Sequence, residues 1–126
     1  MEETYFDIVP IVYELLTPII NENISVESGW YNDKLNKTHV TYCELNDNLD
    51  TVSDDEVESI NHTVQIDVWG FDDLETLKIK EKIRKIINNV DEISNVIGEN
   101  LSEKIEDNSI LYHKALRFDY LEVLEN

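Results

Sequence analysis

The sequence predicts an α+β domain, with a mainly antiparallel sheet of about four to five strands and helices packed on one face of it. Residues 60–68 alternate apolar and polar side chains, which is the pattern of a strand with one buried face. Residues 7–17 and 72–90 instead repeat apolar side chains every three or four positions, which is typical of helices with one buried stripe. Since 126 residues is the length of one ordinary domain, we expect a single domain over residues 1–126.

The first helix is predicted over residues 7–17. Asp7 can cap its N-terminus, Pro10 falls in the first turn, where the missing amide hydrogen costs little, and Pro18 marks its end. Two strands are predicted next, a short one within residues 21–28 and a second one over residues 38–45. The polar segment 46–56 then joins the second strand to the third as a hairpin with a long loop.

The third strand is predicted to turn one face to the core and a polar face outward. The core face holds Ile60, His62, Val64, Ile66 and Val68, and the polar face includes Trp69. Gly70 ends the strand, and Asp72 caps the following helix with Glu75 three residues on. Residues 91–108 are helix-spaced but interrupted by Gly98, which leaves their structure open. A long final strand is expected over residues 109–125.

The charge balance is strongly acidic. Twenty-eight acidic residues against ten basic ones give a formal net charge of −18, which disfavours nucleic acid and acidic lipid as partners. No lysine or arginine occurs between Lys37 and Lys78, so one region of the surface is expected to be strongly negative. Within it, the acidic loop candidates are Asp47, Asp50, Asp54, Asp55 and Glu56.

The cysteine count and the hydropathy indicate in which cellular compartment the protein is made. Cys43 is the single cysteine and cannot form an internal disulfide, and the N-terminal residues lack the pattern of a secretory signal. The apolar runs are far shorter than the roughly 20 residues that span a bilayer. We expect a soluble protein synthesised in a reducing cytoplasm.

The residues that could carry chemistry do not form a known motif. Cys43 and His39 share a strand face but lie roughly 13 Å apart along it, beyond hydrogen-bond reach. His39, His62 and His113 would meet at a zinc ion only if their strands were adjacent and in phase, and a core or interface histidine is the simpler interpretation. The acidic segment lacks the glycine and spacing of a calcium-binding loop. We therefore expect no catalytic, cofactor-binding or metal-binding residues, and no enzyme.

Two features suggest contacts with other subunits. Half of the basic residues lie on the helix at 72–90, where Lys78, Lys82 and Lys85 form either a solvated face or a positive patch that meets the acidic patch of a neighbouring copy. Trp69, on the polar phase of its strand, either anchors an interface or caps the edge of the core.

The succession of "IVYELL", a strand ending in "VQIDVWG", a helix that follows at once and a late strand with "KALRFDYLE" resembles the tail-terminator, or tail-completion, proteins of long-tailed bacteriophages. Related minor tail and neck proteins are close alternatives. The resemblance spans roughly residues 8–122 and carries no catalytic signature.

This resemblance implies a hexameric ring in the virion tail or neck, assembled in the host cytoplasm, that caps the tail tube and joins it to the head. Its partners would be the tail-tube protein and the head–tail connector, and DNA would pass through a repelling acidic lumen. Residues 46–58 would either line that lumen or contact the tube. Trp69, Lys78, Lys82 and Lys85 would form subunit contacts. The alternative function is a small acidic inhibitor or nucleic-acid mimic that binds a basic partner.

Overall fold

The computed structural model describes residues 6–53, 56–104 and 109–124, without the side chains of residues 50–53, 56–58 and 104. Its elements in chain order are α1 (Ile8–Leu15), α2 (Thr17–Ile20), β1 (Ser25–Ser28), β2 (His39–Ser53), β3 (Glu56–Gly70), α3 (Asp73–Asn88), β4 (Ile93–Lys104) and β5 (Ile110–Val123). The strands form one sheet in the order β1-β2-β3-β5-β4, in which β1 and β2 are parallel and the other pairs antiparallel. The predicted α+β fold is confirmed.

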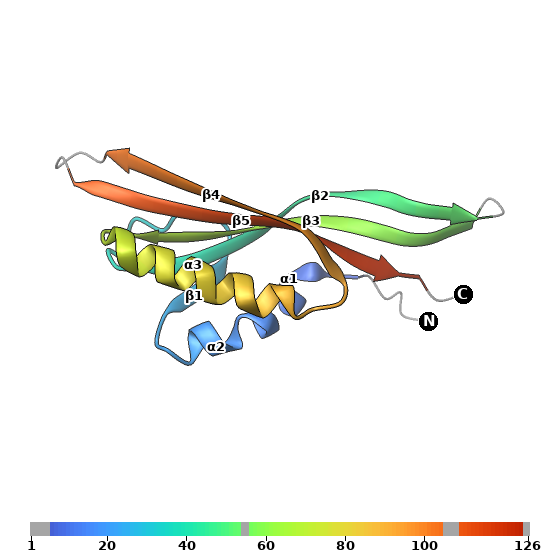
Figure 1. Ribbon diagram of the computed structural model, residues 1–126, viewed down its shortest axis with the longest axis horizontal. Helices are drawn as coiled ribbons and strands as arrows, with labels where there is room; N and C mark the ends of the chain where they lie inside the picture. Colours follow the sequence, from blue (N-terminus) through green and yellow to red (C-terminus); the bar gives the residue numbers. More distant parts are fainter. Residues whose placement is uncertain (1–5, 54–55, 105–108, 125–126) are drawn as a thin grey trace.

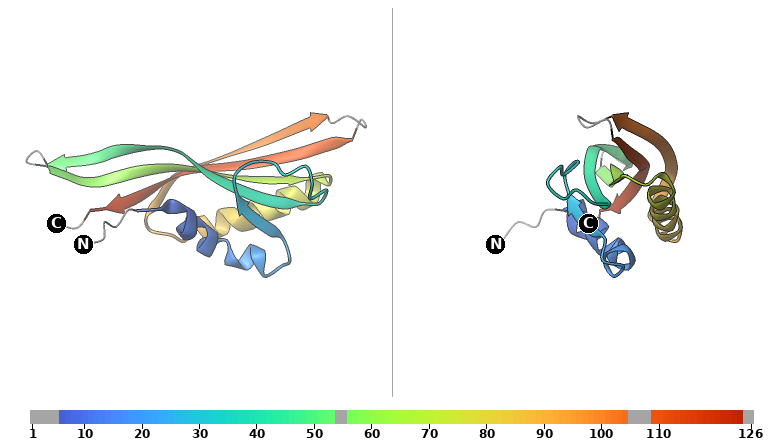
Figure 2. Two further views of the ribbon diagram at one scale, coloured as in Figure 1. Left: turned by 180° about the vertical axis from the view of Figure 1, so that it is seen from behind. Right: turned by 90° about the vertical axis from the view of Figure 1, so that its left-hand side faces the viewer.

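The three helices cover one face of the sheet, and the strands extend beyond them (Figure 1). The β2–β3 hairpin extends past one end of the helical layer, and the β4–β5 hairpin extends past the opposite end. The same arrangement is visible from behind, and the end view shows how strongly the sheet curls (Figure 2). Within the described residues, no helix is both long and apolar enough to cross a membrane.

The helix ends follow the predicted capping residues. The Asp7 side chain accepts a hydrogen bond from the Val9 amide at the start of α1, and the Asp72 side chain accepts one from the Glu75 amide at the start of α3. Pro18 was predicted to mark the end of the first helix. It lies instead in the first turn of the short helix α2, and α1 ends before it at Leu15. A proline is compatible with that position because its missing amide hydrogen would have no partner there.

Two segments differ from the sequence prediction. Residues 46–56 were expected to be a long loop, yet β2 continues to Ser53 and β3 begins at Glu56, so most of this segment is strand. Residues 91–108, left open, contain strand β4. Its helix-like spacing has a structural cause: the register shifts between Ser94 and Ile97, and Asn95 adopts a positive φ of 56°.

Apolar side chains from the sheet and the helices meet in one core. The sheet contributes Val40, Tyr42, Val64, Ile66, Val68, Leu116 and Phe118, and the helices contribute Ile8, Val12, Leu16, Ile19, Ile79, Ile83 and Ile87. The core face predicted for the third strand is confirmed at His62, Val64, Ile66 and Val68, whereas Ile60 is only half-buried. The opposite face was expected to be outward and polar, but Gln65, Asp67 and Trp69 on it are buried.

Candidate functional site

Trp69 lies in a buried aromatic cluster on the sheet face that points away from the helices. Its side chain is 1% exposed and stacks on His113 with ring centroids 3.8 Å apart, while Trp30 meets it edge-on at 5.0 Å. Its Nε1 donates a 2.9 Å hydrogen bond to Thr41 Oγ1. The segment between β1 and β2, which carries Trp30, covers this face. Trp69 is therefore a core residue, and the expectation that it stands at the surface as a subunit contact is wrong.

Asp67, which lies beside this cluster on β3, is the centre of a buried hydrogen-bond network. Asp67 Oδ1 lies 2.6 Å from His113 Nε2 and accepts a 2.8 Å bond from Gln65 Nε2, and Arg117 Nη2 donates to Gln65 Oε1. Asp67 is fully buried, and its Oδ2 and His113 Nδ1 have no hydrogen-bond partner within the described part of the chain. The sequence carries no signal for this network, because Gln65 and Asp67 fall on the face of the third strand that is predicted to be outward and polar.

The basic residues of α3 have separate environments. Lys78 and Lys85 are exposed, while Lys82 pairs with Glu22 of the segment after α2 at 2.7 Å. Lys80 is 4% exposed and donates to Asn100 Oδ1 of β4; burial lowers its pKa, and the nearby positive charge of Arg84 lowers it further. The positive surface of α3 is therefore smaller than the sequence suggests.

The acidic candidates can be placed only in part. Asp47 lies exposed on β2, so it belongs to a strand and not to a loop. Asp54 and Asp55 lie outside the described residues, and so do the side chains of Asp50 and Glu56. Their role in lining a lumen or contacting a tube stays a prediction.

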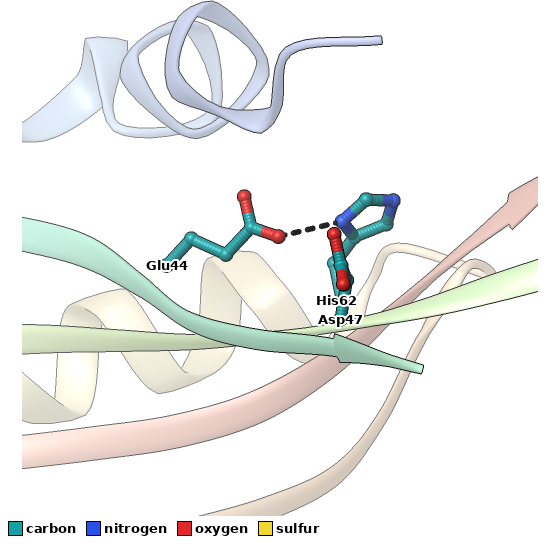
Figure 3. A group of neighbouring side chains, drawn as sticks. All are labelled: Glu44, Asp47 and His62. Atoms are coloured by element: carbon teal, nitrogen blue, oxygen red, sulfur yellow. Dashed lines mark hydrogen bonds and ion pairs between the residues drawn. The ribbon is translucent and has the colours of Figure 1, made fainter. Parts of the chain in front are cut away.

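His62 is the centre of a second charged cluster, on the helix-bearing face of β3 (Figure 3). Its side chain is 5% exposed, its Nδ1 lies 2.9 Å from Glu44 Oε1 of β2, and its Nε2 lies 2.9 Å from Glu122 Oε1 of β5. The Phe6 ring stacks on the imidazole with centroids 4.6 Å apart. Burial alone would lower the pKa of His62, but the hydrogen bonds and charges of the two carboxylates outweigh it and raise that pKa. A protonated His62 links β2, β3 and β5.

A β-bulge in β2 adds a second carboxylate from the same strand. Glu44 is opposite Val64, whereas Asn46 is opposite Thr63 and Asp47 opposite His62, so one residue of β2 is extra at this point. Residues 44 and 47 of a regular strand point to opposite faces. Here the bulge brings ligand atoms of Glu44, Asp47 and His62 within 4.8 Å of one another. The sequence could not reveal this cluster, because its spacing depends on the bulge.

The remaining candidates for chemistry do not converge. His39 and His113 are both in register with Trp69, on the face away from the helices, whereas His62 is on the other face. The three histidines therefore form no common site. Burial raises the pKa of the Cys43 thiol, and the nearby Asp67 carboxylate adds to this effect. Cys43 is thereby kept in the weakly nucleophilic thiol form.

No protein-family model matches the chain, and no match is found among curated proteins.

Proposed function

We propose that the protein is a structural subunit of a phage virion, of the tail-terminator type, that forms a ring on the tail tube and offers the head–tail joining surface. The observation that carries this proposal is the extension of the sheet past both ends of its helical layer as two hairpin arms (Figures 1 and 2). Arms that point in opposite directions allow one subunit to contact two neighbours at once. That is the requirement for a head-to-tail ring.

The outer strands support such contacts because each leaves an open edge. β1 pairs with β2 only at His39–Tyr42, so that within the described residues the rest of β2 is bonded to β3 alone. Among the strands that the structure describes, β4 pairs with β5 alone. The free backbone groups of an edge strand can pair with a strand of another chain. Exposed apolar side chains lie on both edge strands, Leu49 on β2 and Ile97 and Leu101 on β4.

The charge distribution favours contacts of opposite sign. Lys78 and Lys85 are exposed on α3, in a chain whose net charge is −18. A basic helix surface on one subunit can attract an acidic arm of the next, which would make assembly sensitive to salt. The same net charge would keep DNA from binding inside a ring. The number of six subunits is suggested by the family resemblance alone.

Native mass spectrometry and electron microscopy of the purified chain, alone and with tail tubes, test the proposal. We expect rings, or a ring-like cap on tube ends, that weaken as salt increases. The double charge reversal Lys78→Glu with Lys85→Glu should reduce assembly without changing the circular dichroism spectrum. The matched control is Lys34→Glu, a charge reversal of an exposed lysine outside α3.

Two results would contradict the proposal. One is that the chain stays monomeric and does not bind tail tubes. The other is a tight, salt-sensitive complex of a single copy with a basic protein, which would favour the acidic inhibitor instead.

A further inference from the structure

We propose that Glu44, Asp47 and His62 bind a divalent transition-metal ion of the Zn²⁺ class, with Glu122 holding the imidazole in position. The proposal is independent of the ring, since it concerns a site within one subunit. It rests on three observations: the convergence of the ligand atoms, the orientation of the imidazole and the excess of negative charge around it.

The ligand atoms converge because of the β-bulge in β2. Without the extra residue, Glu44 and Asp47 would lie on opposite faces of the sheet. With it, both carboxylates lie on the same face as His62, Glu44 Oε1 is 2.9 Å from Nδ1, and the three ligand atoms lie within 4.8 Å of one another. Figure 3 shows the two acidic side chains approaching the same edge of the imidazole. Two ligands at about 2.0–2.2 Å from a tetrahedral zinc ion lie about 3.3–3.6 Å apart. The exposed Glu44 and Asp47 side chains can move inward to reach that spacing.

The imidazole is oriented as a metal ligand requires. Metal-bound histidines generally donate the other ring N–H to a carboxylate, which fixes the tautomer and aims the free nitrogen at the ion. Here His62 Nε2 lies 2.9 Å from Glu122 Oε1, with the Glu122 side chain only 15% exposed. The stacked Phe6 ring and the burial of His62 hold the ring plane. Nδ1 thereby faces Glu44 Oε1 of β2 at 2.9 Å.

The negative charges around His62 favour binding of a cation. Glu44, Asp47 and Glu122 surround one imidazole, so a neutral His62 would turn its Nδ1 lone pair toward carboxylate oxygens. A single proton on Nδ1 offsets one negative charge, whereas a divalent ion offsets two and is bound by all three groups. One imidazole nitrogen with two carboxylates favours Zn²⁺, Co²⁺ or Mn²⁺ over Mg²⁺ and Ca²⁺, which prefer all-oxygen sites. Water would complete the coordination shell.

Isothermal titration calorimetry of the full chain, treated with EDTA and then dialysed, tests this site with ZnCl₂ and, separately, with MgCl₂. We expect one zinc ion per chain, a higher melting temperature with zinc, and no comparable effect of magnesium. Cobalt absorption in the visible range reports the ligand set directly. Asp47→Asn and Glu44→Gln should each weaken zinc binding by at least about tenfold, and Glu122→Gln by about 10–100-fold. Glu99→Gln, an exposed acid on β4, is the matched control and should bind zinc as the unchanged chain does.

The proposal is overturned if zinc does not bind at one ion per chain, or if binding survives both Asp47→Asn and His62→Gln. Zinc held by His39 or His113 would show this second outcome. His62→Gln changes a buried residue, and this variant can fail to fold. In that case Asp47→Asn, which changes an exposed residue, decides the test by itself. Ring formation measured in EDTA separates a failed metal site from a failed ring proposal.

Discussion

Replacing Trp69 by alanine should lower the free energy of unfolding by about 3–5 kcal/mol, the range for deleting a buried large aromatic side chain. The structure supports this range because Trp69 is 1% exposed, stacks on His113 at 3.8 Å and donates a hydrogen bond to Thr41, which is itself fully buried. The milder Trp69→Phe keeps most of the ring but leaves the Thr41 hydroxyl without its donor, so it should cost about 1–3 kcal/mol.

Urea unfolding followed by circular dichroism measures these changes. Trp30→Ala is the matched control, since Trp30 is 54% exposed and meets Trp69 only edge-on. Trp30 also meets His113 edge-on at 5.5 Å, so its loss should cost about 1–2 kcal/mol, the scale of two aromatic contacts. The reasoning is refuted if Trp69→Ala costs less than about 1 kcal/mol while ring formation is lost. That result would return Trp69 to the role of a subunit contact.

Three further outcomes test the local structure. Asp72→Ala removes the N-cap of α3 and should cost about 1 kcal/mol by urea unfolding, and a loss near zero would show that the cap is unimportant. Gly70→Ala would place its Cβ 2.7 and 2.9 Å from the side chains of two threonines and should cost about 1–3 kcal/mol. Gly98→Ala should cost less, because the close atoms there belong to the ends of lysine and arginine side chains; equal costs would refute this distinction. Burial would raise the pKa of Asp119, but hydrogen bonds from three polar side chains outweigh it and lower that pKa. The stability it contributes is thus present above the unfolded pKa of about 3.9 and is lost as the pH falls through the lower folded pKa. Asp119→Asn should therefore flatten the acid part of a plot of stability against pH, and an unchanged slope below about pH 4 would contradict this.

The parts of the fold that the sequence predicted are those set by neighbouring residues. Asp7 and Asp72 mark helix starts because a capping carboxylate acts within three residues of its own position. The core phase of β3 is likewise visible in the alternation from His62 to Val68. The length of β2 was missed, because its acidic composition resembles a solvated loop. Pairing with β3, from Asn46 opposite Thr63 to Ser53 opposite Glu56, makes this segment a strand, and its composition does not report that pairing.

The polar phase of β3 shows why burial was harder to predict than strand position. Trp69 and Asp67 alternate with apolar neighbours, and such alternation is typical of a strand with one wet face. The second face is buried because the segment between β1 and β2 lies over it and brings Trp30 against Trp69. Nothing in the local pattern of β3 reports this cover, so alternation indicates a strand more reliably than it indicates exposure.

His62 and His113 show that sheet register, and not residue type, decides what a histidine can do in this chain. Both are buried and both contact carboxylates. His113 lies against the fully buried Asp67 and the Trp69 ring, where the aromatic side chains cover it. His62, across the sheet, lies among carboxylates that are partly exposed, and solvent ions can therefore reach it. The bulge also places Asp47 opposite His62, and for that reason the charged cluster of His62, and not that of His113, is where we expect a metal ion to bind.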